Sequence, residues 1–319
     1  MKWLMVCAIL IGALILIVLI ATVYFFRYAI CRNDKYTTEA ALARMKKSTP
    51  PAQFAIIEQG VEGFLKAKKQ DVTVKSRDGL LLHGYLMEPS PPTESRGTVL
   101  LVHGWRSHPE IDFSASWESY LKKGLNILAI EQRAHSGSEG KYICFGVKER
   151  FDVLDWVNFL GERYGQNHKI VISGVSMGGA TVLMTLGEEE LPKNVVGATA
   201  DCGYVSPWAQ FEYILHRSYH LPNFPLLYTT NLLSRAVADF SFRGWSTEQS
   251  LKNAKIPVLM LHGLADTFVP PTHSRRSAAA CASPCELIEV EGAGHGMSYL
   301  VDPDTVKAKL DAFFERVLT

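Results

Sequence analysis

The chain has 319 residues, with 33 Lys and Arg against 32 Asp and Glu, so its formal net charge is +1. This near-neutral balance argues against a nucleic-acid-binding protein held by phosphate contacts, which needs a basic surface. A hydrophobic content of 47% with 20% charged residues excludes a disordered chain and suits a folded globular protein. The six cysteines do not make a disulfide scaffold, and no cluster of His, Cys and Asp has the spacing of metal ligands.

The first segment is predicted to be an uncleaved membrane anchor over residues 1–30. The run Trp3–Phe26 contains no charge and is flanked by Lys2 and Arg27. At about 1.5 Å per residue, this run crosses a hydrocarbon core about 30 Å thick. A secretory signal peptide is the alternative, but its apolar region is usually about 7–15 residues long and ends in small residues. Here the run ends in the aromatic residues 24–26, which are typical of a membrane interface.

Charge around this segment favours a cytoplasmic location for the rest of the chain, although long carboxy-terminal domains can also be translocated. The basic residues that follow the run are Arg27, Arg32, Lys35, Arg44, Lys46 and Lys47. Cys281 and Cys285 leave the compartment open, because they could form a disulfide in an oxidising compartment or remain two free thiols.

Residues 31–70 are interpreted as a linker with one amphipathic helix over 52–65, after the break at Pro50 and Pro51. A β-hairpin is predicted next, over 72–87, because two apolar runs flank the turn Arg77-Asp78-Gly79. Residues 89–96, which are rich in Pro and Ser, are predicted to form an exposed loop.

From Gly97 onwards the pattern alternates between buried strands and helices, which predicts an α/β domain over 71–319 with a mostly parallel sheet. The expected strands are 98–102, 125–130, 169–172, 195–199, 256–261 and 286–290, and the expected helices are 112–123, 148–164, 179–186 and 305–317. Ligands bind at the carboxyl ends of the strands in such folds, so the site is expected there.

Residues 203–252 interrupt this alternation, because they are rich in aromatic residues and proline and have no strand pattern. A structureless loop of that length is improbable, so a helical cap inserted over the sheet edge is predicted. An ordinary crossover helix with long flanks is the alternative.

The strongest chemical motif is Gly174-Val175-Ser176-Met177-Gly178, which lies between a predicted strand and a predicted helix. This is the nucleophile-elbow pattern in its required context. A serine hydroxyl is a weak nucleophile, so it must be exposed at a sharp turn where a base can reach it. Ser176 is therefore the predicted nucleophile. The alternative is a glycine-rich turn with a solvated serine.

A base and an acid follow in the expected order. His295 stands in a glycine-rich loop after the last strand, and it is the predicted base. Asp266 follows the strand 256–261 and is the predicted acid, which would fix the imidazole tautomer and stabilise the imidazolium. Asp201, at the end of the preceding strand, is the competing acid, and its alternative role is to cap the following turn.

The oxyanion site needs two backbone N–H donors. Met177, directly after the nucleophile, is expected to supply one, and Trp105, in the loop after strand 98–102, the other. The ring of His103 is expected to brace this loop rather than act as a base.

Several motifs together resemble the α/β-hydrolase superfamily, and most closely the membrane-anchored bacterial serine hydrolases of the serine-aminopeptidase-like branch. They are His103-Gly104, the segment 131–138, the elbow, the segment 262–266 and Gly294-His295. The resemblance covers about residue 71 to the end. It implies an eight-stranded sheet, a Ser-His-Asp triad and no cofactor. Ala134 departs from it, since relatives usually carry glycine there.

These observations predict a serine hydrolase that cleaves a carboxylic ester, with an apolar or aromatic substrate group under the aromatic-rich cap. The alternative within the same chemistry is an amide-cleaving peptidase, an aminopeptidase or dipeptidyl-peptidase-like enzyme. That enzyme would need acidic residues to bind a charged peptide terminus, and the acidic run 188–190 is interpreted instead as a solvated face. A non-catalytic, membrane-tethered binding protein is the remaining alternative.

Overall fold

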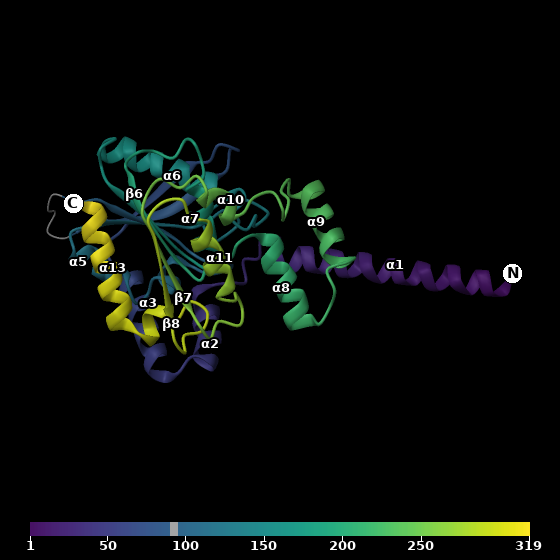
Figure 1. Cartoon of the computed structure of the whole chain (residues 1–319). Helices are drawn as coiled ribbons and strands as arrows, with labels where there is room; N and C mark the ends of the chain where they lie inside the picture. Colours follow the sequence, from purple (N-terminus) through teal and green to yellow (C-terminus); the bar gives the residue numbers. More distant parts are fainter. Residues whose placement is uncertain (90–94) are drawn as a thin grey trace.

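The computed structural model describes residues 1–89 and 95–319. It contains one eight-stranded sheet in the order β1-β2-β4-β3-β5-β6-β7-β8 (Figure 1). The strands are β1 (Gln70–Lys75), β2 (Leu81–Met87), β3 (Thr98–Val102), β4 (Asn126–Ile130), β5 (Ile170–Val175), β6 (Val195–Asp201), β7 (Val258–Gly263) and β8 (Cys285–Val290). β2 runs antiparallel to β1 and β4, and the remaining neighbours are parallel. The predicted α/β fold with a mostly parallel sheet is therefore confirmed. The loop expected over 89–96 lies largely outside the described residues.

Helices cover both faces of the sheet (Figure 1). They are α1 (Lys2–Ala29), α2 (Thr38–Ser48), α3 (Pro51–Lys66), α4 (Pro109–Asp112), α5 (Trp117–Lys122), α6 (Glu149–Tyr164), α7 (Met177–Thr185), α8 (Pro207–Tyr219), α9 (Leu226–Val237), α10 (Thr247–Leu251), α11 (Thr272–Ala280), α12 (Ser298–Val301) and α13 (Pro303–Leu318). Successive side chains of a strand point to opposite faces. Leu100 therefore packs with α6 and α7, whereas Val99 and Leu101 pack with α3, α5 and α13.

The helix predicted over 112–123 is wrong as one element, because the chain breaks between α4 and α5. The break lets α3 approach closely: a Cβ added at Gly60 would overlap the Ser114 carbonyl group. The indole of Trp117 also donates to the Gly60 carbonyl oxygen at 3.0 Å. The break between α4 and α5 therefore coincides with a tertiary contact to α3, which is distant in sequence.

The segment interpreted as a linker contains an additional helix, α2, and packs on the domain. Thr37 caps α2 by accepting from the Ala40 amide. In α3, Phe64 is fully buried in the core on one sheet face, and Val61 packs with Ile111. The chain leading from α1 to β1 is thus held against the sheet domain.

Three helices, α8 to α10, lie between β6 and β7, where the helical cap was predicted. We call residues 207–237, which comprise α8, α9 and their connection, the cap. The cap lies on the side of the domain from which α1 projects, and α9 packs against α1 (Figure 1). The Thr22 and Thr229 hydroxyl oxygens are 2.6 Å apart across this contact.

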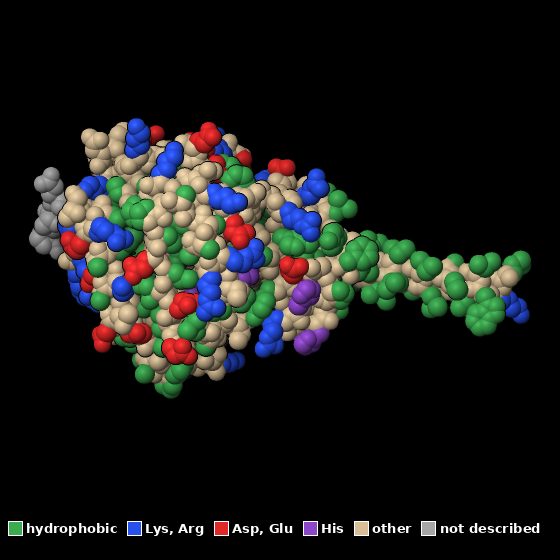
Figure 2. Space-filling model, in the orientation of Figure 1, with side chains coloured by type: hydrophobic (Ala, Val, Ile, Leu, Met, Phe, Trp, Pro, Cys, Tyr) green, Lys and Arg blue, Asp and Glu red, His purple; other side chains and the backbone are tan. Residues whose placement is uncertain are grey.

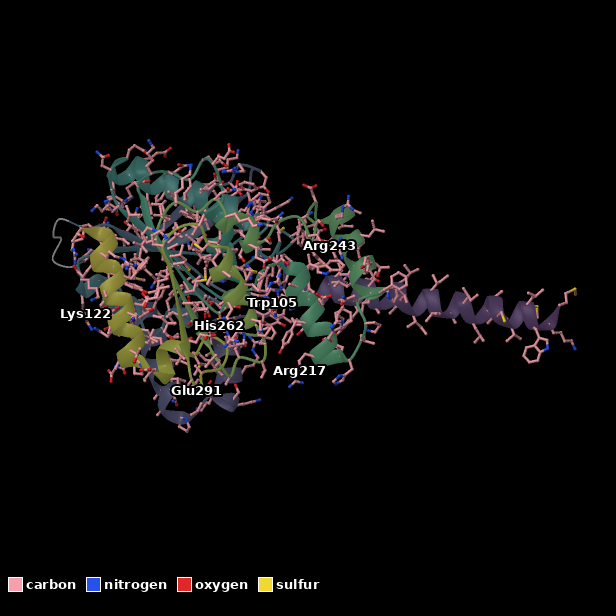
Figure 3. All side chains as sticks on the ribbon, in the orientation of Figure 1. Trp105, Lys122, Arg217, Arg243, His262 and Glu291 are labelled. Carbon is pink, nitrogen blue, oxygen red and sulfur yellow. The ribbon has the colours of Figure 1, made fainter. Side chains whose placement is uncertain are left out.

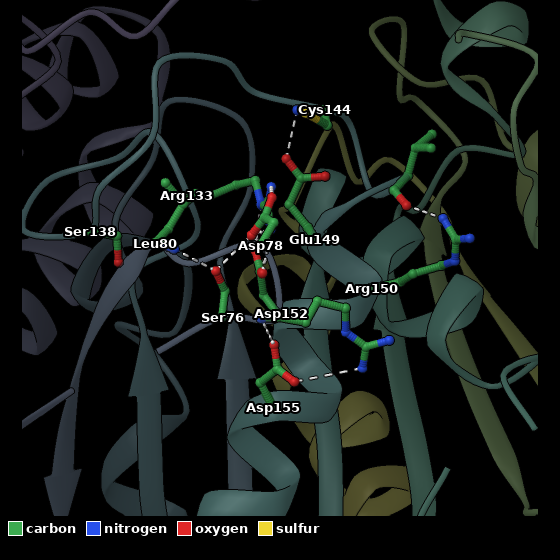
Figure 4. Close-up of polar contacts among 12 residues, drawn as sticks. Ser76, Asp78, Leu80, Arg133, Ser138, Cys144, Glu149, Arg150, Asp152 and Asp155 are labelled. Atoms are coloured by element: carbon green, nitrogen blue, oxygen red, sulfur yellow. Dashed lines mark hydrogen bonds and ion pairs between the residues drawn. The ribbon is translucent and has the colours of Figure 1, made fainter. Parts of the chain in front are cut away.

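A buried ion cluster fixes the loop after β4 (Figure 4). Arg133, with only 4% of its side chain exposed, donates to Asp152 at 2.6 Å and to Asp78 at 2.8 Å. Burial raises the pKa of Asp78, but hydrogen bonds from Arg133 and Ser76 lower it to about 2. The neighbouring Ala134 has a φ of 60°, the left-handed conformation that glycine adopts most easily. This conformation explains why glycine suits that position in the superfamily that the sequence resembles.

Candidate active site

Ser176 alone joins β5 to α7. Its backbone has φ 56° and ψ −117°, a conformation that residues other than glycine rarely adopt. A Cβ added at Gly174 would overlap the Gly178 carbonyl group, and one added at Gly178 would overlap the Val102 carbonyl oxygen. The two glycines therefore allow the tight strand-to-helix turn that raises the serine above the sheet edge.

The structure brings Ser176, His295 and Asp266 together. His295 Nε2 lies 2.8 Å from Ser176 Oγ, and His295 Nδ1 lies 2.7 Å from Asp266 Oδ2. The other carboxylate oxygen, Oδ1, accepts the backbone N–H groups of Phe268 and Val269 at 2.8 and 2.9 Å. This arrangement orients the carboxylate toward one ring nitrogen and leaves the other ring nitrogen facing the serine.

Asp266 is held in its charged form. Burial raises its pKa, but hydrogen bonds from His262 and His295 and the attraction of His295 hold that pKa below its ordinary value. His262 is itself fixed, because its ring nitrogens contact Ser274 Oγ at 2.6 Å and the Val269 carbonyl oxygen at 2.9 Å. The ionised carboxylate is suited to keep a proton on His295 Nδ1, which leaves Nε2 free to accept one.

Asp201, the competing acid, makes a different contact. Its carboxylate accepts from Ser298 Oγ at 3.0 Å, and its backbone carbonyl oxygen accepts the Ser176 N–H at 2.8 Å. Burial raises the pKa of the Asp201 carboxyl group. The pKa of Asp266 is lowered instead, by its hydrogen bonds to the two histidines. Of the two carboxylates, Asp266 is the one hydrogen-bonded to His295.

The loop after β3 runs directly beside Ser176. A Cβ added at Gly104 would lie 3.2 Å from the Ser176 Cβ, so glycine permits this approach. Asp112 braces the loop by accepting from the Gly104 N–H at 2.6 Å and the Ser107 hydroxyl at 2.6 Å. Within the described residues, the backbone N–H of Trp105 donates to no protein acceptor. It can therefore meet a substrate oxygen.

Met177 begins α7, so its backbone N–H belongs to the first turn of a helix, where no intrahelical acceptor exists. Among the residues that the structure describes, this N–H also has no protein acceptor. His103 lies behind the loop: its Nδ1 contacts the Gly104 carbonyl oxygen at 2.7 Å, and its Nε2 accepts the Gln132 N–H at 3.0 Å. Burial holds the pKa of His103 well below its ordinary value, which favours a neutral ring that braces the loop.

Two cavities meet at Ser176. The larger, about 370 Å³, extends under α2 to α4 and carries polar groups such as Ser107, Ser114 and Asp112. The smaller, about 200 Å³, lies between α8 and the end of α1 and is lined mainly by aromatic and aliphatic side chains. Trp105 lines both cavities and lies where the sheet domain meets the cap (Figure 3).

One group near the site has the composition of a metal centre. The ligand atoms of Cys202, Asp266 and His295 lie within 4.8 Å of one another. Burial raises the pKa of the Cys202 thiol well above its ordinary value, so this thiol is protonated and a poor metal ligand. Both ring nitrogens of His295 are already hydrogen-bonded. The donor set therefore does not fit a metal ion.

Two features of the site were not predicted from the sequence. Asp112 was placed in a helix, but its carboxylate braces the loop at Ser176. Phe25, Tyr28 and Ala29, at the end of α1, line the smaller cavity. Their only sequence signal was an aromatic end to the apolar run, which membrane partitioning alone explains.

The acidic run after α7 takes part in ion pairs rather than forming only a solvated face. Glu188 pairs with Arg150 at 2.6 Å, and Glu190 pairs with Arg77 at 2.5 Å. Neither glutamate lines the two cavities at Ser176.

The sequence model of the alpha/beta hydrolase family matches residues 99–309. The chain belongs to this family. Among curated proteins it is similar to YqkD of Bacillus subtilis, with 25% identity over 256 residues, 80% of this chain and 82% of that protein. It is also similar to YfhR of Escherichia coli K12, with 24% identity over 232 residues, 71% of this chain and 73% of that protein.

Solved structures share the fold. An esterase from Pyrococcus furiosus aligns with a TM-score of 0.64 and 24% identity over 80% of this chain and 95% of that chain. An acylaminoacyl peptidase from Pyrococcus horikoshii aligns with a TM-score of 0.57 and 21% identity, over 80% of this chain and 43% of that chain. Family membership and these neighbours support a hydrolase.

Proposed function

We propose that this chain is a serine hydrolase that cleaves a carboxylic ester through an acyl-enzyme. The observation that carries the proposal is the hydrogen-bonded series from Ser176 Oγ through His295 to Asp266, at 2.8 and 2.7 Å. A serine nucleophile, a base within hydrogen-bonding reach and a third group that orients the base are the parts that acyl transfer requires.

In the proposed reaction, Ser176 Oγ attacks the ester carbonyl carbon while its proton passes to His295 Nε2. The tetrahedral intermediate then breaks the bond to the alcohol oxygen, and His295 returns the proton to that oxygen. Water then attacks the acyl-enzyme while His295 takes its proton; the bond to Ser176 Oγ breaks, His295 returns the proton to Oγ, and the carboxylic acid is released. Asp266 stabilises the imidazolium in both halves of the reaction.

The oxyanion of each intermediate would accept the backbone N–H groups of Trp105 and Met177. Their lack of protein acceptors in the described part of the chain supports this assignment. The Met177 N–H also stands at a helix N-terminus, whose partial positive charge favours an anion. Each such donor contributes about 3 kcal/mol to transition-state stabilisation.

An ester substrate is favoured over an aminoacyl amide by the charges around the nucleophile. Among the described residues, the carboxylates lining the two cavities are Asp112 and Asp201. Both accept hydrogen bonds from the protein, Asp112 from the Gly104 N–H and Asp201 from Ser298, which gives each carboxylate a structural role. The apolar lining of the smaller cavity suits an acyl chain.

We also propose that α1 anchors the enzyme in a membrane. α1 is long and apolar enough to cross a bilayer. Burial of Phe26 at 5% and of Ile30 at 0% in the domain supports an uncleaved helix, because removing it would expose that core. The basic residues after α1 favour the cytoplasmic side. Protease protection of the domain in intact cells tests this orientation.

A fluorophosphonate probe tests the catalytic proposal. We expect the wild-type chain to be labelled and the Ser176→Ala variant to lose labelling. A folded wild type that takes no label would support a non-catalytic binding protein instead. A panel of p-nitrophenyl esters measured against aminoacyl and dipeptidyl anilides then separates an esterase from a peptidase, and faster cleavage of the anilides would refute the ester assignment.

A further inference from the structure

The smaller cavity has a neighbouring cavity between α1 and the cap. A further space of about 40 Å³ lies between α1, α8 and α9 and shares lining residues with that cavity. The residues common to both are Phe25, Ala29, Phe211 and Ile214. We call the combined space the anchor channel. One of its walls is the end of the proposed membrane helix, and its inner end is the nucleophile.

The end of α1 is fixed to two loops of the domain, one of which borders Ser176. The Trp105 indole donates to the Ala29 carbonyl oxygen at 2.9 Å, and the Ile143 N–H donates to the Ile30 carbonyl oxygen at 2.8 Å. Phe25 packs edge-on against Tyr219 of the cap, with ring centroids 5.0 Å apart. α1 is therefore a structural wall of the channel, and not only a tether to the membrane.

The free part of α1 has the length of the hydrocarbon core. Residues 2–20 are almost all exposed, and burial against the domain begins at Thr22. Nineteen residues at 1.5 Å each span about 28 Å, close to the core thickness of about 30 Å. The channel residues Phe25 and Ala29 lie about one and a half and two and a half turns beyond residue 20, which places this part of the channel beside the membrane interface.

The cap presents a surface suited to that interface. Apolar side chains around the base of α1 are exposed, as Figure 2 shows. The exposed apolar residues of the cap include Leu221 at 41%, Phe224 at 72%, Tyr228 at 46% and Leu232 at 64%. Arg217, on α8, and Arg243, just after the cap, lie at this end of the molecule (Figure 3). Exposed apolar residues with nearby cations are typical of a surface that rests on lipid headgroups.

We infer that the substrate is a lipid-like ester drawn from the bilayer, whose single acyl chain enters between α1 and α8 through the anchor channel. The inference rests on the proposed function, because the channel ends at Ser176. The acyl chain lies in the apolar channel, and the ester carbonyl faces Ser176. The alcohol part lies in the larger, more polar cavity beside Ser107 and Ser114. Such a substrate reaches the serine without crossing water.

Filling the channel tests this inference. The full chain is purified in one detergent, and kcat/KM is measured for p-nitrophenyl dodecanoate and p-nitrophenyl acetate. Ala29→Phe fills the channel from the α1 side, and Ile214→Trp fills it from the cap side. Ala13→Phe, on the exposed part of α1, is the matched control. Because every variant is measured in the same detergent, partitioning of the esters cancels in the comparison.

We expect the dodecanoate-to-acetate ratio to fall at least tenfold in both channel variants and to stay within twofold of wild type in Ala13→Phe. Labelling by the small probe diisopropyl fluorophosphate identifies the variants that remain folded. An unchanged ratio in labelled Ala29→Phe and Ile214→Trp would overturn the channel while leaving the hydrolase intact. Failure of wild type to be labelled or to cleave the acetate would instead remove the proposed function.

Delivery from the bilayer is tested in phosphatidylcholine vesicles that contain the full chain and the dodecanoate ester. The bulk ester concentration is held constant while phospholipid is added. We expect the rate to fall as the added phospholipid lowers the mole fraction of ester in the bilayer. A rate that follows the bulk concentration would refute delivery from the membrane.

Discussion

The choice of Asp266 over Asp201 as the catalytic acid is decided by substituting each with asparagine. Asp266 Oδ1 accepts two backbone N–H groups, and Oδ2 faces His295 Nδ1 at 2.7 Å. In Asp266→Asn, the amide oxygen should keep the two backbone donors, which places the amide NH₂ opposite His295. That NH₂ donates to Nδ1 and forces the imidazole proton onto Nε2, where it faces Ser176.

An imidazole with its proton on Nε2 cannot accept the serine proton. We therefore expect kcat to fall by about 10⁴-fold, which corresponds to about 5 kcal/mol of transition-state stabilisation. Both variants are assayed with p-nitrophenyl butyrate, and thermal unfolding shows that each is folded. The measurement separates loss of the tautomer from loss of structure.

Asp201→Asn is the matched control, because it changes a half-buried carboxylate at the end of the neighbouring strand. Its amide oxygen can still accept from Ser298, and the contact to Ser176 comes from the backbone. We expect a loss of less than tenfold. Equal losses in the two variants, or an Asp266→Asn enzyme within tenfold of wild type, would refute this reasoning.

Three further changes test the packing around the site. Arg133→Met leaves the buried Asp152 carboxylate without its guanidinium partner, so we expect denaturant titration to show a loss of about 3–5 kcal/mol, and an unchanged midpoint would contradict this. The folded pKa of Asp78 is about 2, below its ordinary 3.8, so its contribution to stability is present above about pH 4 and is lost as the pH falls toward 2. Asp78→Asn should therefore flatten the pH dependence of Tm in that window, and parallel profiles would count against it. Gly178→Ala overpacks the elbow and should lower the free energy of unfolding by about 1–3 kcal/mol. Gly294→Ala is the control and should change Tm little, because its added carbon meets no described atom within 4 Å. Similar shifts in Tm for the two variants would argue against close packing at the elbow.

The sequence was sufficient to predict the α/β domain because strand burial and turn chemistry are local signals. Apolar runs too short for helices marked the strands, and the elbow glycines marked the turn at Ser176. The break between α4 and α5 was not predictable in this way. It coincides with the approach of Gly60 from a helix about fifty residues earlier in the chain, and no local pattern encodes that contact.

The sequence by itself determined the nucleophile-elbow pattern and the chain order of Ser176, Asp266 and His295, since strand-end positions can be counted along the chain. Only the tertiary structure shows that Asp266, and not Asp201, is hydrogen-bonded to His295, because both follow neighbouring strands and the contact depends on where the imidazole points. The tertiary structure also brought Phe25 and Ala29 of α1 to the cavity that Ser176 lines. An apolar helix carries the same sequence signal whether it faces lipid or lines a cavity, so packing alone distinguishes the two.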